Sequence, residues 1–243
     1  MPNFLKRLSR SIRGFSHRQA LTRLRDDLHF VPTVIYDIGA HQARWTTVAR
    51  GIFPDSQYFL FEANPDNAEV LQASKERHFI ATLSFADGIE CDFFVPRANI
   101  STTGASLYRE RSVHYQGNNA RVVRVTTRRL DSLVAEERLP PPDLIKLDVQ
   151  GAELAILRGS GALLDKCSAI IAEVSLLPGN DRAPLAAEVM MGFGDYGFRC
   201  VDLCKVRRTR IGSVTQLDLL FAKNALYGRY MAAADVLDPM SQT

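Results

Sequence analysis

The chain has 243 residues, of which 46% are hydrophobic and 23% are charged. That length fits about one folded domain, and the composition excludes an intrinsically disordered or collagen-like chain. No stretch approaches the roughly 18 apolar residues that span a bilayer, and no apolar block follows the basic N-terminus as it does in a secretory signal. The four scattered cysteines are too few for a disulfide scaffold. We therefore expect a cytoplasmic protein with one sizeable core.

Basic charge gathers at the N-terminus. Residues 1–25 hold seven of the 30 basic residues and no acidic one, which leaves 23 basic against 27 acidic residues in the rest of the chain. A nucleic-acid-binding domain spreads basic charge over its folded surface, so we expect no nucleic-acid partner. Apolar residues recur in this segment at spacings of three and four, which predicts a basic amphipathic helix. Such a helix either contacts an anionic membrane surface or covers the edge of the domain with its arginines in solvent.

From residue 31 the chain alternates between predicted strands and helices. Short runs rich in β-branched and aromatic residues predict strands over 31–40, 57–65 and 78–88. Apolar residues at helical spacing predict helices over 42–51 and 66–77. This alternation is typical of a parallel sheet with helices on both faces.

Residues 89–127 interrupt the alternation with two extended pieces around a polar loop. We expect a β-hairpin inserted before the fourth strand of the sheet. A polar loop as long as 97–120 is often functional, so it either recognises a substrate or forms a solvated surface loop.

The alternation then returns and ends in two strands. A strand behind three prolines leads to a helix over 152–164, and a strand over 168–178 leads to a helix over 182–196. The runs RCVDLCKVR and TQLDLLFAKN close the pattern as an antiparallel pair. We therefore expect an α/β domain over 31–225, with a basic helical segment over 1–30 before it and a tail over 226–243 after it.

Polar residues follow nearly every predicted strand at its carboxyl end. In an open parallel sheet these ends meet at one edge, where ligands bind. Core strands have no need of carboxylates, so the repetition predicts a single ligand site. The residues concerned are Asp37 and Gly39, Glu62 and Asn64, Ser84 and Asp87, Asp148 and Gln150, and Glu173 and Ser175.

The first turn indicates which ligand this edge binds. Gly39 lets the backbone approach a ligand, and Glu62, about 20 residues further on, is placed to accept both hydroxyls of a ribose. Only one glycine is present in this turn, so the G-x-G-x-x-G bed for a pyrophosphate is absent. This weighs against an NAD-dependent oxidoreductase, which remains the less favoured alternative. S-adenosylmethionine has no phosphate and carries cationic groups that suit an acid-rich edge.

Seven stretches occur in the order in which one enzyme family carries them. They are VIYDIGAH, YFLFEANPDN, STTGASLY, VTTRRLDSL, LIKLDVQGAELAILRGS, IIAEVS and QLDLLFAKN, within residues 33–223. On these motifs the sequence resembles the FkbM-type methyltransferases, and IKLDVQGAE followed by LRGS is the most specific. The resemblance implies a class I methyltransferase fold, a Rossmann-like doubly wound sheet of seven strands with the last antiparallel. It also implies S-adenosylmethionine as cofactor and methyl transfer to a hydroxyl of a sugar, glycoconjugate or polyketide-type product.

The resemblance also implies roles for the residues at the strand ends. The methionine part of the cofactor would lie against Asp37 and Gly39, and Ala40 next to them would also bind the cofactor. Its ribose hydroxyls would be held by Glu62, its adenine would lie near Ser84 and Asp87, and Asn64 would be a further cofactor-binding residue. Asp148 would lie beside the transferred methyl group.

One departure from the family concerns Ala43, which stands where the family has a second glycine. Its methyl group would either be tolerated at the start of a helix or crowd the cofactor. In the second case the chain would be a catalytically degenerate partner subunit. A further departure, Ala63 in place of a proline, falls in a turn.

Removal of the acceptor's proton needs a general base. The candidates are, in order, Asp148 for its position, Glu173, and then His41, since histidine is the side-chain type that titrates closest to neutral pH. Glu153 is also close, but at the start of a helix it offsets the helix dipole. Asp148 and Glu173 without a third ligand make a weak metal signal, so we expect no metal.

Overall fold

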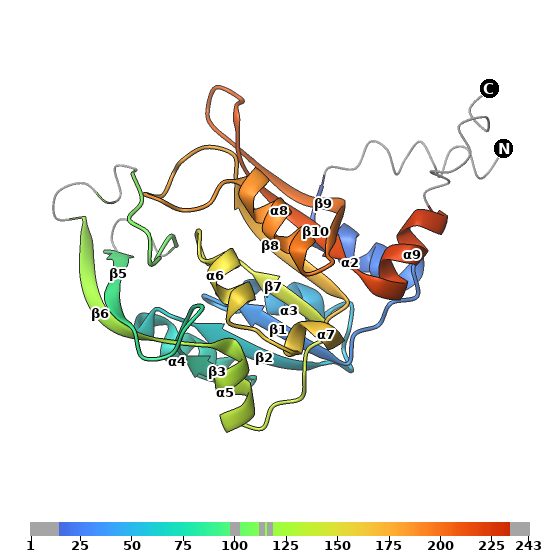
Figure 1. Cartoon of the computed structure of the whole chain (residues 1–243), viewed down its shortest axis with the longest axis horizontal. Coiled ribbons are helices and arrows are strands. Elements are labelled where there is room, and N and C mark those ends of the chain that lie inside the picture. Colours follow the sequence, from blue (N-terminus) through green and yellow to red (C-terminus); the bar gives the residue numbers. More distant parts are fainter. Residues whose placement is uncertain (1–14, 98–102, 112–114, 116–118, 234–243) are drawn as a thin grey trace.

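The computed structural model describes residues 15–97, 103–111, 115 and 119–233. Seven strands form one sheet in the order β3-β2-β1-β7-β8-β10-β9 (Figure 1). All neighbours are parallel except β10, which runs antiparallel to both β8 and β9. The seven-stranded α/β sheet is therefore as predicted. Its strands are β1 (Val34–Ile38), β2 (Gln57–Glu62), β3 (Arg77–Ile80), β7 (Leu144–Leu147), β8 (Ala169–Ser175), β9 (Arg199–Arg208) and β10 (Val214–Ala222).

Helices cover both faces of the sheet, and each face has its own apolar core. Buried residues of the first group of helices pack against one face: α5 (Leu130–Glu136), α6 (Glu153–Arg158), α7 (Leu163–Lys166) and α8 (Ala186–Asp195). Those of the second group pack against the other face: α2 (His17–Asp26), α3 (Arg44–Arg50), α4 (Ala68–Ala73) and α9 (Asn224–Ala233). A short 3-10 helix, η1 (Pro65–Asn67), precedes α4.

The face below α2 and α3 changes from apolar to charged along the strands. Side chains alternate between the two faces of a sheet, so Ile35 and Asp37 of β1 point to the same face. Ile35 lies in the apolar core of that face, and Asp37 is completely buried beyond it. Lys146, Glu173 and Asp218 are likewise buried near this edge. Buried charges are rare unless they are paired, so this edge is the place to look for function.

The predicted third strand is in fact two strands. β3 ends at Ile80, and Ala81 donates its N–H to the Glu62 carbonyl, 2.8 Å away. The chain then leaves the main sheet, because β4 (Thr82–Leu83) pairs in parallel with β6 (Ala120–Arg128).

The predicted hairpin before the fourth strand of the sheet is confirmed. β5 (Glu90–Pro96) runs antiparallel to β6 and completes a three-stranded sheet in the order β4-β6-β5. The helix expected over 152–164 is broken into α6 and α7. At the break, a Cβ on Gly159 would lie 2.1 Å from the Ser84 carbonyl oxygen. The first helix therefore ends where its backbone packs against Ser84, which directly follows β4.

Residues 1–14 of the predicted amphipathic segment lie outside the described residues. The described part forms α2, which Ser16 caps by accepting a hydrogen bond from the Gln19 N–H. Leu21 and Leu24 of this helix are fully buried, and Arg23 is paired with Asp202 of β9. No helix in the described ranges is long and apolar enough to cross a membrane.

Candidate functional site

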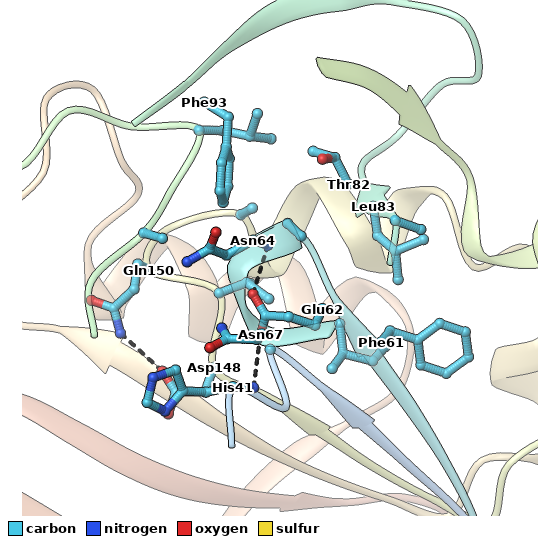
Figure 2. A pocket seen from close by; sticks show the side chains of 18 of the residues that line it. His41, Phe61, Glu62, Asn64, Asn67, Thr82, Leu83, Phe93, Asp148 and Gln150 are labelled. Carbon is cyan, nitrogen blue, oxygen red and sulfur yellow. Dashed lines mark hydrogen bonds between the residues drawn. The ribbon is translucent and has the colours of Figure 1, made fainter. Parts of the chain in front are cut away.

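A cleft opens at the carboxyl ends of β1, β2 and β7, where the strand order of the sheet reverses. Ligands bind at this position in open α/β sheets. The cleft has an empty volume of about 800 Å³, including the part open to solvent. Figure 2 shows the polar side chains around it. The lining includes Gly39, His41, Glu62, Asn64, Asp148 and Gln150.

Glu62 is held rigidly at the end of β2. Its Oε2 accepts the His41 N–H at 2.7 Å, and its Oε1 accepts the Asn64 N–H at 2.7 Å (Figure 2). Burial raises the pKa of Glu62, and these two backbone hydrogen bonds oppose the shift. A carboxylate offers about four lone-pair sites. The Asn67 side chain also hydrogen-bonds this carboxylate, and the lone-pair capacity that remains is available to a ligand in the cleft.

Glycine is required at position 39 by the packing of the protein, independently of any ligand. Its φ is +77°, and a Cβ there would lie only 2.0 Å from the Asp148 carbonyl oxygen. The end of β7 therefore approaches the first turn so closely that no side chain fits between them. The N–H groups of Gly39 and Ala40 both donate to the Phe61 carbonyl. Ala40 is buried and does not line the cleft.

Ala43 does not narrow the cleft. It adopts the left-handed conformation, with φ of 55°, and it directly precedes α3. Its methyl group is buried in the core beneath α2 and α3, and the residue is not part of the cleft wall. A left-handed backbone is the conformation that glycine adopts at no steric cost, which accounts for the family's glycine at this position. The departure therefore strains the backbone rather than the ligand site.

A buried lysine joins two of the predicted acids. Lys146 lies opposite Asp37 in the register of β7 and β1, and its Nζ is 3.2 Å from Asp148 Oδ2. Asp37 Oδ2 accepts a hydrogen bond from the Thr46 hydroxyl at 2.6 Å. Burial raises the pKa of Asp37, while Lys146 acts against that rise. Asp37 does not line the cleft, so its place is beneath the site as the partner of Lys146.

Gln150 connects Asp148 to Glu173. Its Nε2 donates to Asp148 Oδ1 at 2.9 Å and to Glu173 Oε1 at 2.6 Å, and Gln216 adds a second donor to Glu173 at 2.8 Å. Glu173 is buried behind these amides and lines neither this cleft nor its neighbour. Gln150 itself has a left-handed backbone, with φ of 56°.

The pKa values of Asp148 and Glu173 are shifted in opposite directions. Burial favours the neutral form of Asp148, but the Lys146 ammonium and the Gln150 amide outweigh it and lower the pKa of Asp148. For Glu173, burial together with the neighbouring carboxylates of Asp148 and Asp218 raises the pKa to about 8. Pairs of groups whose environments separate their pKa values in this way are typical of acid–base sites.

A second cavity adjoins the cleft, and both are lined by Thr103, Gly104 and Gln150. It has an empty volume of about 1100 Å³. Its walls come from the ends of β8, β9 and β10 and from two loops, whose backbones are joined by the Arg111 N–H to Gly179 carbonyl bond and by the Asp181 N–H to Arg109 carbonyl bond, both 2.8 Å long.

Of the remaining predicted site residues, His41 lines the cleft and Ser84 and Asp87 do not. His41 lines the cleft, and its Nε2 is buried without a hydrogen-bond partner among the described residues. Ser84 is buried outside the cleft wall. Asp87 is exposed, where it accepts the Arg129 N–H and the Ser132 hydroxyl. Thr82, Leu83 and Phe93 line the cleft on this side in place of Ser84 and Asp87.

Comparisons with known proteins find methyltransferases among the solved structures similar to this chain. A comparison with curated proteins finds no match. The precorrin-6y C5,15-methyltransferase of Geobacter metallireducens is 15% identical over 85% of each chain, with a TM-score of 0.43. A Burkholderia thailandensis 1,6-didemethyltoxoflavin-N1-methyltransferase, solved with S-adenosylhomocysteine, is 13% identical over 85% of this chain and 77% of that one, with a TM-score of 0.41. Human N-acetylserotonin methyltransferase, solved with S-adenosylmethionine, is 12% identical over 85% and 51%, with a TM-score of 0.41.

The family itself is identified by the sequence. The methyltransferase FkbM domain matches residues 37–200, more than half of the chain. This range includes the first turn, Glu62 and the Asp148 segment. The chain therefore belongs to the FkbM methyltransferase family and has the class I fold of the S-adenosylmethionine-dependent methyltransferases.

Proposed function

We propose that this protein is an S-adenosylmethionine-dependent O-methyltransferase that acts on a hydroxyl of a sugar, glycoconjugate or polyketide-type acceptor. The observation that supports this proposal most strongly is the arrangement of the two cavities. The cleft that Glu62 lines and the second cavity meet at Gln150, whose side-chain amide donates a hydrogen bond to Asp148. A group-transfer enzyme needs two adjoining sites with a reactive group at their junction.

The cleft fits the proposed cofactor. Glu62 retains acceptor capacity for a ribose hydroxyl, and Asn64 and Asn67 lie beside it in the cleft wall. Leu83 and Phe93 provide apolar surface for a flat base. When bound, S-adenosylmethionine supplies a methyl group made electrophilic by its positively charged sulfur. The anionic Asp148 in the same wall suits that positive charge.

Asp148 is the proposed proton acceptor. It lines the cleft, and 32% of its side chain is exposed. Because Lys146 and Gln150 keep it ionised, it can accept a hydrogen bond from the acceptor hydroxyl and then its proton. A positioned base of this kind typically accelerates a reaction by about 10²–10⁴-fold. Glu173 does not reach the cleft and acts through Gln150.

The second cavity is the proposed acceptor site. Its lining is rich in side-chain amides and hydroxyls, which can exchange hydrogen bonds with a polyhydroxylated molecule. They belong to Thr103, Gln150, Ser175, Asn180, Thr215 and Gln216.

Calorimetric titration with S-adenosylmethionine, S-adenosylhomocysteine and NAD tests the cofactor. We expect micromolar binding of the first two and none of NAD. Glu62→Gln should weaken binding at least about tenfold, because each lost hydrogen bond to a charged group is worth about 1.5–3 kcal/mol. Glu69→Gln, an exposed change on α4, should bind as the wild type does. Tight binding of NAD alone would replace the proposal with an oxidoreductase.

The same titration, combined with a methyl-transfer assay, distinguishes an active enzyme from a degenerate subunit. Asp148→Asn should bind S-adenosylhomocysteine with an affinity close to that of the wild type while methyl transfer to a screened panel of hydroxylated acceptors falls by about 10²–10⁴-fold. If wild type and variant both bind the cofactor and neither methylates any acceptor, the degenerate-subunit interpretation gains over catalysis.

A further inference from the structure

The second cavity contains a cation that the rest of the protein leaves poorly neutralised. Arg207 of β9 is the one lysine or arginine among the described residues that line it. Its side chain is 52% exposed. In the described part of the chain its guanidinium makes no hydrogen bond, and its nearest acid is Glu173, at 3.7 Å from Oε2.

Glu173 does not balance this charge. Its Oε1 already accepts hydrogen bonds from Gln150 and Gln216. Burial and the neighbouring carboxylates of Asp148 and Asp218 raise its pKa, which disfavours the charged form that would neutralise Arg207. The half-exposed guanidinium, whose nearest acid among the described residues is 3.7 Å away and makes no hydrogen bond to it, is therefore available to a ligand.

The neighbouring basic residue of the same strand face stands in a different register environment. Lys205, two residues earlier on β9, lies opposite Asp218 of β10. Arg207 lies opposite Gln216, which in turn lies opposite Ser175 of β8. Opposed residues share a face of the sheet, so Arg207 stands in register with a neutral amide and a hydroxyl, and the carboxyl group near its guanidinium is that of Glu173, two residues from Ser175 along β8.

The acid that lines the same cavity is at a different place. Glu110 lies against Gly104, where a Cβ would be 3.0 Å from its Oε2. Gly104 lines both cavities, whereas Arg207 lines only the second. Glu110, like Arg207, lines only the second cavity, but its carboxylate lies by Gly104, on the side where the cavities meet, and among the described residues it forms no ion pair with Arg207.

We propose that the second cavity selects an acceptor that carries an oxyanion, a carboxylate or a phosphate, and that Arg207 holds this group while a hydroxyl of the same molecule faces Asp148. This inference rests on the proposed function and narrows its substrate class. A guanidinium presents a planar fork of donors that matches both oxyanions. The amides and hydroxyls around it suit a hydroxylated carbon skeleton.

Binding of four probes to the protein tests the inference: glucose, glucuronate, glucose 6-phosphate and inorganic phosphate. We expect at least one charged probe to bind about tenfold or more tightly than glucose, since a paired arginine contributes on that order. The carboxylate and phosphate probes distinguish the two sources of the oxyanion. Equal or undetectable binding of all four at millimolar concentration would overturn the proposal.

Two matched variants identify the residue. Arg207→Gln should abolish the preference for charged probes. Arg208→Gln removes the same charge one position along β9, on the opposite face, where Arg208 contacts the Gly212 carbonyl, and should retain the preference. An unchanged preference in Arg207→Gln would assign the anion to another group. Titration of the wild type with S-adenosylhomocysteine tests the proposed cofactor separately from the proposed anion site. If the wild type does not bind S-adenosylhomocysteine, the proposed cofactor is contradicted, while the probe preference still shows whether Arg207 binds an anion.

Discussion

Asp148 and Glu173 share one hydrogen-bond donor, the side-chain nitrogen of Gln150, at 2.9 and 2.6 Å. Two carboxylates this close would repel each other if both were ionised. The shared amide and Lys146 favour the charge on Asp148, and the proton remains on Glu173. Because the amide lowers the pKa of both acids, it is Lys146 that favours the charge on Asp148 over the charge on Glu173.

Gln150→Met removes this shared donor while nearly preserving side-chain volume. We expect the pKa of Asp148 to rise, because a hydrogen bond to its charged form is lost. Since Asp148 must be ionised to accept a proton, the acidic limb of the activity profile should move to higher pH. We also expect kcat/KM to fall by about 10–100-fold, the loss of one such hydrogen bond.

A pH profile of methyl transfer measures both effects. Gln216→Met is the informative comparison, because it removes a donor to Glu173 alone and should leave the acidic limb where it is. An identical profile for wild type and Gln150→Met would mean that the amide does not control the charge of Asp148.

Lys146→Met leaves two buried carboxylates without their common cation. Removing one partner of a buried ion pair typically costs about 3–5 kcal/mol. Without Lys146, burial would raise the folded-state pKa values of Asp37 and Asp148 above their unfolded values. The protein should therefore be least stable at pH 8 and recover as the pH falls and the carboxyls protonate.

Urea denaturation at pH 5 and pH 8 measures this difference. Lys166→Met, at an exposed position on α7, is the control and should show little change at either pH. A loss of the same size at both pH values would indicate that packing, rather than charge, explains the role of Lys146.

The first turn offers a contrasting pair of substitutions. Gly39→Ala should cost about 3 kcal/mol or more, since the new Cβ meets the Asp148 carbonyl in a left-handed backbone. Ala43→Gly relieves a similar backbone strain of about 1–2 kcal/mol but loses a buried methyl group and adds chain entropy. Its stability should stay within about 1 kcal/mol of the wild type.

Thermal denaturation and cofactor titration measure both variants. We expect the cofactor affinity of Ala43→Gly to be unchanged, because the alanine is outside the cleft wall. A tenfold tighter affinity in this variant would show that the alanine does crowd the cofactor.

Glu153→Gln should flatten the dependence of stability on pH. Glu153 is 2% exposed, and its Oε1 accepts the Val149 and Gly151 N–H groups at 3.3 and 3.2 Å. Burial raises its pKa to about 7, above an unfolded value near 4.3. The folded state thus binds more protons than the unfolded state between these values, and stability falls as the pH rises through them.

Glutamine keeps the acceptor oxygen and has no charge to bury. At pH 8 the variant should be more stable than the wild type by up to about 3 kcal/mol, and at pH 4 the two should be equal. Chemical denaturation across this pH range, with Glu69→Gln as the control, measures the difference. Parallel curves for variant and wild type would mean that Glu153 is not buried as a neutral group.

The fold was accessible from sequence because its signals are local. Alternating strands and helices, and the antiparallel final pair, follow from runs of a few residues. The two errors depend on distant contacts. Gly159 ends α6 against Ser84, some 75 residues earlier in the chain. The third strand breaks at Ala81 because β4 finds its partner in β6.

The sequence predicts only those site residues that follow directly from the positions of the strand ends. Glu62 and Asp148 line the cleft because they stand at the ends of β2 and β7. The same argument placed Asp37 and Asp87 in the cleft, but a position in sequence does not give the direction of a side chain. Lys146 had no predicted role, although a lysine within the apolar run LIKL is itself a signal, since a buried cation needs an acid nearby.

The sheet order has a consequence for how the protein is made. β10 lies between β8 and β9, and in the described structure β9 pairs with β10 alone. During synthesis β9 therefore leaves the ribosome before its partner exists and must wait unpaired. A fragment ending at residue 200, where the family match ends, would expose the edge of β8 to other chains. The hydrogen bond from Gln216 to Glu173 can form only after β10 has been synthesised and has paired with β8, so the candidate site is incomplete until then.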